Sequence, residues 1–149
     1  TTTTTTPKPR KSSLSGGECL YHNQEIISPN GCFRLVMQGD GNVVVYRIHD
    51  HHVVWSNYMQ GKGGHMLCMQ TDGNLVLYTA SHGVVWTVAK AGHHGGWLAM
   101  QDDANLVLYR GPHYWATMHS GTKNENQSVF DFMTDSYRLL VVEFKNTNF

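Results

Sequence analysis

The chain has 149 residues, a common size for one domain, and its 11 Lys and Arg residues balance its 11 Asp and Glu residues. Nucleic acid and anionic membranes both select a basic surface, so this balance gives no reason to expect either as the main partner. No apolar run approaches the roughly 20 residues that span a bilayer, so we expect no membrane insertion.

The first segment, residues 1–15, opens with a run of threonines and continues into a stretch rich in Pro and Lys. This composition does not bury apolar surface. It predicts a linker or tail, which is either the end of an O-glycosylated stalk or a plain disordered terminus.

Residues 16–121 contain three copies of one pattern. In each copy an apolar stretch ends at Gln, and an Asp-Gly or Asp-Ala pair, an Asn, a run of aliphatic residues, a Tyr and a Trp follow. The glutamines stand at positions 38, 70 and 101, so the period is about 31 residues. We interpret this segment as one domain built from three structural repeats.

Each repeat predicts a β-hairpin, because an Asp-Gly pair between two apolar runs is typical of a tight turn. Alternation along the return strand places Asn42, Val44 and Tyr46 on one face, and Val43 and Val45 on the other. Helical periodicity is absent, so the predicted fold class is all-β. A repeat this short cannot close its own core, so the three must share one, filled by the aliphatic faces and the tryptophans. Those tryptophans are Trp55, Trp86 and Trp115.

The third turn has Ala104 where the other two have glycine. If this position requires a positive φ, the alanine costs on the order of 1 kcal/mol. The last segment, residues 122–149, lies outside the repeats, and residues 128–144 predict an additional hairpin. Its apolar last strand should pack on a neighbouring chain or on the edge of the repeats' own sheets.

The polar residues of each repeat follow a fixed spacing of two, Q-x-D-x-N-x-V-x-Y. Sugar hydroxyls donate and accept hydrogen bonds at once, and Asp, Asn, Gln and Tyr side chains together offer both kinds of partner. The alternative interpretation is that these residues only satisfy the backbone of turns. A turn has no need for Gln and Tyr at fixed offsets, so three copies favour a ligand-binding set. Its members are Gln38, Asp40, Asn42, Val44 and Tyr46, then Gln70, Asp72, Asn74, Val76 and Tyr78, then Gln101, Asp103, Asn105, Val107 and Tyr109.

This motif resembles that of the bulb-type (monocot mannose-binding, lily-type) lectins. The resemblance implies a β-prism of three four-stranded antiparallel sheets with pseudo-threefold symmetry, a tryptophan core and one mannose site per sheet. It assigns the Asp and Asn of each repeat to the axial 2-hydroxyl of mannose, the Gln to the 3-hydroxyl, the Tyr to the 4-hydroxyl and the Val to the face of the ring.

The chain has three cysteines. In plant members of the family, a disulfide joins the turn of the first motif to the second repeat, but here that turn position is Gly41. We therefore expect Cys68 to remain a free thiol and any disulfide to join Cys19 to Cys32.

We expect no metal or cofactor. The histidine clusters at residues 49–52 and 93–94 fall where the repeats differ, so we interpret them as solvated loops rather than a metal site or a pH sensor. An N-glycosylation sequon begins at Asn126, and it matters only if the protein is secreted.

The sequence therefore predicts a secreted, multivalent lectin for mannose or mannose-rich glycans, acting as a homo-oligomer. One alternative is a structural or adhesive extracellular assembly protein built on a lectin fold. Another is a lectin-like bacterial toxin, which the single-domain length disfavours. Catalysis is disfavoured because glycoside hydrolysis usually requires two carboxyl groups, and each repeat supplies one recurring Asp.

Overall fold

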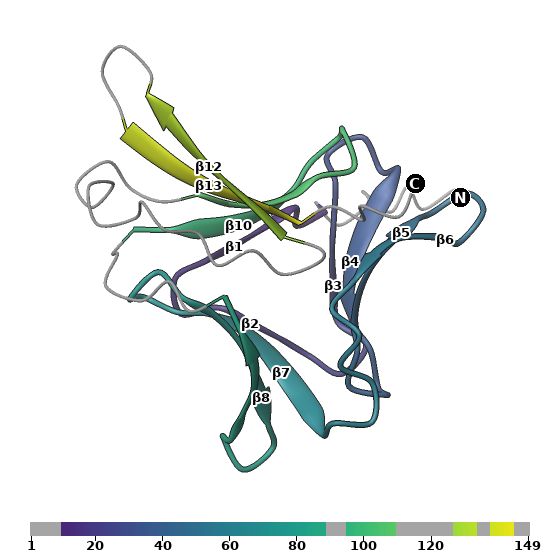
Figure 1. Ribbon diagram of the computed structural model, residues 1–149. Helices are drawn as coiled ribbons and strands as arrows, with labels where there is room; N and C mark the ends of the chain where they lie inside the picture. Colours follow the sequence, from purple (N-terminus) through teal and green to yellow (C-terminus); the bar gives the residue numbers. More distant parts are fainter. Residues whose placement is uncertain (1–9, 89–94, 110–126, 134–137, 145–149) are drawn as a thin grey trace, which may run out of the picture.

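The computed structural model describes residues 10–88, 95–109, 127–133 and 138–144. In this part of the chain all the regular structure is β, and the strands form three antiparallel sheets around a common axis (Figure 1). This is the predicted prism, except that two sheets have four strands and the third has five. Within these ranges, no helix is long and apolar enough to cross a membrane.

Each repeat contributes a central hairpin to its own sheet, and the remaining strands come from elsewhere in the chain. The first sheet has the order β3 (Glu25–Ile27), β4 (Phe33–Met37), β5 (Val43–Arg47) and β6 (His52–Ser56). The second has the order β2 (Cys19–Tyr21), β7 (Gly64–Met69), β8 (Leu75–Thr79) and β9 (Val84–Thr87). The third has the order β1 (Ser13–Ser15), β10 (Trp97–Met100), β11 (Leu106–Tyr109), β13 (Arg138–Phe144) and β12 (Gln127–Met133).

The short N-terminal strands link the three sheets, because β1, β2 and β3 each begin a different one. β1 lies in the segment that the sequence predicts to be a linker or tail. Leu14 of β1 is only 1% exposed and belongs to the core cluster. Ordered structure therefore begins before residue 16, because one leucine between serines is enough to anchor a three-residue strand.

The core lies on the axis between the inner faces of the sheets. Alternation along the strands places Val43 and Val45 in this cluster but leaves Val44 on the outer face, as predicted. Trp55 is 2% exposed in the core and Trp86 packs against it. The third predicted tryptophan, Trp115, lies outside the described residues.

Phe144 from β13 supplies a third aromatic ring to this core. Its ring centroid lies 5.1 Å from that of Trp55 and 6.0 Å from that of Trp86, and the side chain is 1% exposed. Such tilted aromatic contacts stabilise a core beyond the area that they bury. The C-terminal segment thus completes the interior of the domain.

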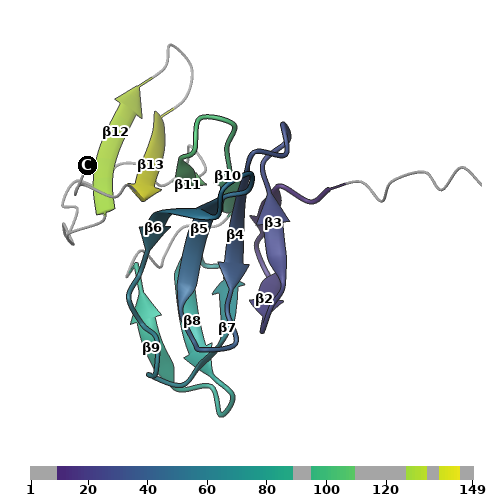
Figure 2. The same cartoon turned by 90° about the vertical axis from the view of Figure 1, so that its right-hand side faces the viewer.

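The same segment extends the third sheet. β13 pairs with β11, with Leu106 opposite Phe144, and β12 pairs with β13 on the outside (Figure 2). Of the two places expected for the last apolar strand, the structure shows the edge of the chain's own third sheet. β12 is then the edge strand of that sheet.

The expected cysteine pairing is wrong, because the disulfide joins Cys19 to Cys68 and leaves Cys32 free and exposed. Cys19 on β2 is the register partner of Cys68 on β7, and their Cα atoms are 4.1 Å apart. The prediction treated Cys19 and Cys32 as neighbours in the first repeat. In the fold, Cys19 lies on β2 of the second sheet, whereas Cys32 directly precedes β4 of the first sheet, and this separates the two residues.

Candidate functional site

The motif residues of each repeat lie around the hairpin turn and the return strand of its sheet. In the first sheet, Gln38 follows β4, Asp40 stands in the turn, Asn42 precedes β5, and Tyr46 lies on β5. The two other sheets repeat this placement on β7–β8 and β10–β11. The structure therefore brings the five residues of each repeat together, once on each sheet.

The turn is held by the same three hydrogen bonds in every repeat. In the first, the Gln38 N–H donates to the Asn42 carbonyl (2.9 Å) and the Gly41 N–H donates to the Gln38 carbonyl (3.0 Å). The Asp40 Oδ1 atom accepts the backbone N–H of Asn42 (2.9 Å). The corresponding Asp–Asn distances in the second and third repeats are both 3.0 Å. One carboxylate oxygen of each motif Asp is therefore used by the backbone.

The residue that follows the motif Asp has a positive φ in all three repeats, namely 89° at Gly41, 86° at Gly73 and 74° at Ala104. Ala104 therefore does stand at a position that requires a positive φ, where an alanine is costly. An L-residue with a Cβ is strained in this left-handed region, which is why the other two turns use glycine.

The motif Gln and Tyr contact each other across the motif Val. The side-chain amide of Gln38 is hydrogen-bonded to the Tyr46 hydroxyl, and Gln70–Tyr78 and Gln101–Tyr109 repeat this pair. For Gln70, the orientation that satisfies both ends of the amide has its oxygen accept from the Tyr78 hydroxyl and its nitrogen donate to the Asp72 Oδ1 atom at 3.1 Å. Tyr, Gln and Asp then form one polar chain along the outer face.

The motif valines lie beneath this polar layer. Val44, Val76 and Val107 are only 2%, 3% and 1% exposed. Their contact with the face of a sugar ring stays a prediction, because the Gln and Tyr side chains above them are the groups that a ligand would displace.

The motif Asn is fixed by the neighbouring strand, a feature that the sequence analysis missed. Asn42 Oδ1 accepts from the Ser56 hydroxyl (3.1 Å) and from the backbone N–H of Met59 (3.0 Å). Asn74 Oδ1 accepts from the Thr87 hydroxyl (3.0 Å). The sequence does contain a sign of this contact, because a residue with a hydroxyl group follows the Trp of the first and second repeats. In the third repeat Ala116 stands at that position.

The third site differs in how its Asn is used. The Asn105 Nδ2 atom donates to Asp103 Oδ2 at 3.0 Å, so these two motif side chains bond to each other. The three sites thus share residue types and turn geometry while differing in the supports of the Asn.

A surface hollow of about 460 Å³ marks the second site. It contains three of the motif residues, and the Cys19–Cys68 disulfide forms part of its wall. Its lining residues are Gly17, Cys19, Cys68, Met69, Gln70, Thr71, Asp72 and Tyr78.

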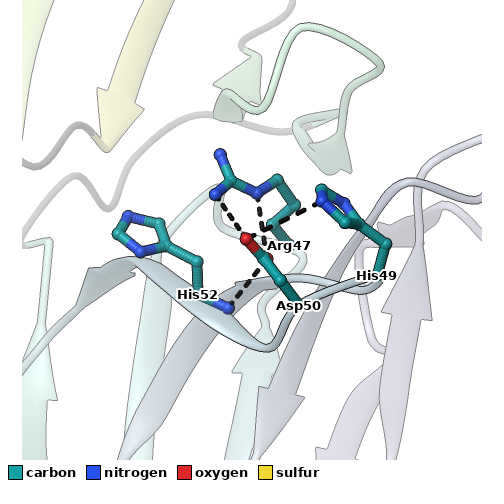
Figure 3. A network of polar contacts seen from close by, with 4 residues as sticks. All are labelled: Arg47, His49, Asp50 and His52. Atoms are coloured by element: carbon teal, nitrogen blue, oxygen red, sulfur yellow. Dashed lines mark hydrogen bonds and ion pairs between the residues drawn. The ribbon is translucent and has the colours of Figure 1, made fainter.

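In the histidine-rich segment at residues 49–52, the first three residues lie in the turn between β5 and β6, and His52 begins β6 (Figure 3). Arg47 Nη2 lies 2.6 Å from Asp50 Oδ2, and Asp50 Oδ1 accepts the His52 backbone N–H at 3.1 Å. The hydrogen bonds from the guanidinium hold the pKa of Asp50 well below its usual range, and Asp50 in turn raises the pKa of Arg47. His49 Nε2 is 3.7 Å from Asp50 Oδ2. The carboxylate here closes a hairpin.

The described residues contain no group of three or more His, Cys, Asp or Glu side chains placed to hold a metal ion. The other histidine cluster, at residues 93–94, lies outside these residues.

The chain is similar to solved lectin structures. It covers the whole of the mannose-specific agglutinin from snowdrop (Galanthus nivalis) bulbs, solved with methyl-α-D-mannoside, at 31% identity and a TM-score of 0.63 over 74% of this chain. It covers 99% of the Polygonatum cyrtonema lectin, solved with monomannoside, at 34% identity and a TM-score of 0.62, again over 74% of this chain.

A curated relative is the B-type lectin plumieribetin of Scorpaena plumieri, which is 37% identical over 68 residues. That match spans 46% of this chain and 58% of plumieribetin. No family model matches the chain. The prism, the threefold repeat and the identity to full-length lectin domains agree, and this chain belongs to the bulb-type lectin family.

Proposed function

We propose that the protein is a carbohydrate-binding lectin that takes one mannose residue at each of three sites, one on each sheet. The observation that carries this proposal is the threefold recurrence of the same polar arrangement: an Asp-anchored turn, an Asn beside it and a Gln–Tyr pair. The snowdrop and Polygonatum lectins, solved with mannosides, support mannose as the ligand.

The hydrogen bonds within the first site indicate which atoms a sugar would meet. The Oδ1 atom of Asp40 is used by the turn, so Oδ2 is the oxygen that would accept from a ligand. The Oδ1 atom of Asn42 is used by Ser56 and Met59, so its Nδ2 is the group that would donate. One hydroxyl placed between them would donate to the carboxylate and accept from the amide, as the axial 2-hydroxyl of mannose would.

The Gln and Tyr of each site would take the 3- and 4-hydroxyls, exchanging their bond to each other for bonds to the sugar. This exchange keeps the number of hydrogen bonds nearly constant, so the net gain per site is small. We therefore infer affinities of roughly millimolar per site, and useful avidity from several sites acting on one glycan surface. The Cys19–Cys68 disulfide supports placing the protein in an oxidising, extracellular compartment.

Calorimetric titration of the purified chain with methyl α-D-mannoside and methyl α-D-glucoside tests the proposal. The two sugars differ only in the orientation of the 2-hydroxyl. We expect the mannoside to bind and the glucoside to bind at least about tenfold more weakly, because it leaves a charged acceptor unpaired. Equal affinities, or no binding of the mannoside, would contradict the proposal.

A further inference from the structure

One register position, beside the motif Tyr on the outer face of each sheet, carries a different chemistry in each repeat. Arg34 is opposite Tyr46 and lies 5.0 Å from its ring centroid, and Met66 is opposite Tyr78. In the third sheet this position is Trp97, opposite Tyr109.

The Trp97 ring is stacked on the Tyr109 ring, with centroids 4.9 Å apart and an interplanar angle of 16°. Despite this contact, Trp97 is 37% exposed, one of the few large apolar side chains on the described surface. One ring face packs on a motif residue, so the exposed part of the indole borders the third site directly.

The glycine before Trp97 lets the two strands that carry the stacked pair come close together. A Cβ atom at Gly96 would come within 2.9 Å of the Tyr109 carbonyl oxygen and 3.3 Å of the Met69 methyl group. Only glycine lets β10 begin so close to the end of β11. The indole therefore stands on the first residue of a strand whose start lies close against the end of the strand that carries Tyr109.

Small side chains surround Trp97 on the β1 side. Ser15 is its register partner on β1, and Ser13 is the partner of Ala99, which shares the face of Trp97. The positions that correspond to Ala99 in the other two sheets hold the larger Val36 and Cys68. These positions on β1 and β10 hold no charged residue, so the β1 side of the indole leaves room for a neutral occupant. The charged residues nearest in register are Glu143, opposite Val107 on β13, and Glu18, which accepts the Ser15 N–H and pairs with Lys11.

We propose that Trp97 forms a second subsite for a neutral hexopyranose, the sugar next to the mannose bound at the third site of the same glycan. This inference rests on the proposed function. The face of an indole carries partial negative charge, and the axial C–H groups of a pyranose present partial positive charge to it. Stacking on Tyr109 already orients the indole, so the Trp97 side chain loses little conformational freedom when a sugar binds. The third site would then bind a disaccharide, whereas the sites beside Arg34 and Met66 have no aromatic side chain at this position to bind the second sugar.

The test uses a protein in which only the third site is active, made by Asp40→Asn and Asp72→Asn. In this background Trp97 is compared with Trp97→Met, because Met66 shows that the same register position accepts methionine. The ligands are methyl α-D-mannoside and the α-linked mannobioses, titrated by calorimetry and by tryptophan fluorescence. Trp97→Phe serves as the conservative variant that retains an aromatic face.

We expect at least one mannobiose to bind about threefold to tenfold more tightly than the mannoside, and Trp97→Met to remove that advantage while the mannoside affinity stays the same. Trp97→Phe should restore part of the advantage. The disaccharide should change the tryptophan fluorescence in the background protein and not in Trp97→Met. An unchanged ratio of affinities, or an equal loss for both ligands, would overturn the inference. Failure of the background protein to bind any sugar would overturn the proposed function, and the subsite with it.

Discussion

The motif aspartates act on the fold as well as in the candidate site. The motif allows two interpretations, ligand binding and satisfaction of the turn backbone, and the second describes one oxygen of each carboxylate. Replacing Asp with Ala would therefore remove a turn hydrogen bond together with the sugar acceptor. Asp→Asn separates the two, because the amide oxygen can still accept from the backbone while the other position becomes a donor.

The turn of the third repeat carries a strain that a single substitution should relieve. Ala104 has a φ of 74° in the position where the other repeats have glycine. We predict that Ala104→Gly stabilises the protein by about 1 kcal/mol, as the left-handed strain exceeds the entropy gained by the unfolded chain. Equilibrium urea denaturation measures this change.

The matched control is Gly41→Ala in the first turn. Its Cβ would add the same left-handed strain and would also lie 3.1 Å from the backbone nitrogen of Gly64, so it should destabilise by more than Ala104→Gly stabilises. Opposite signs for the two substitutions are expected. A destabilised Ala104→Gly protein would contradict this account of the turn.

Among the strands, the three central hairpins could be predicted from the sequence because their pattern repeats. The alternation of inward and outward side chains along them could be predicted for the same reason. The three-residue strands β1, β2 and β3 could not, since so short a segment carries no periodicity and each pairs with a distant hairpin. The wrong disulfide assignment has the same origin. Cys19 meets Cys68 only because β2 pairs with β7, and that register depends on the path of the whole N-terminal segment.

The disulfide joins two strands 49 residues apart in sequence. We predict that Cys68→Ser lowers the free energy of unfolding by about 3–4 kcal/mol, chiefly because the unfolded chain regains the freedom of a long loop. Denaturation of the variant and of the unsubstituted protein, each with and without reductant, measures this loss.

Cys32→Ser is the control, because this thiol is exposed and unbonded and its replacement should leave stability unchanged. Reductant should destabilise the unsubstituted protein and leave Cys68→Ser unaffected. Equal stability of Cys68→Ser and the unsubstituted protein would show that the bridge does not form.

For the whole molecule, the C-terminal segment is the part that the repeat pattern could not place. Threefold symmetry predicts three equivalent tryptophans, yet the described core combines Trp55 and Trp86 with Phe144 from beyond the repeats. The fifteen motif positions were identified in sequence because their spacing recurs. Trp97 was not, because only the third repeat carries an aromatic residue there.

The interior position of Phe144 predicts a large cost for its removal. Phe144→Ala should lower the free energy of unfolding by about 3–5 kcal/mol, through lost burial and the cavity left beside the tryptophans. Chain truncation after Gly121 should be more severe, since it also leaves the β11 edge unpaired and open to aggregation. Thermal unfolding with light scattering distinguishes the two effects.

A truncated chain that remained monodisperse and as stable as the full chain would contradict this role for β13. A Phe144→Leu variant, which keeps an apolar side chain in the core, should lose less stability than Phe144→Ala.

The central proposal is that the three sites are alike and bind mannose through their aspartates. The most direct measurement is calorimetric titration of methyl α-D-mannoside into the unsubstituted chain, the Asp40→Asn variant and the triple Asp40/Asp72/Asp103→Asn variant, each verified as folded by its unfolding transition. We expect three mannosides per chain, then two with unchanged affinity for the remaining sites, and then no measurable binding. Mannose binding by a folded triple variant at the affinity of the unsubstituted chain would contradict the account.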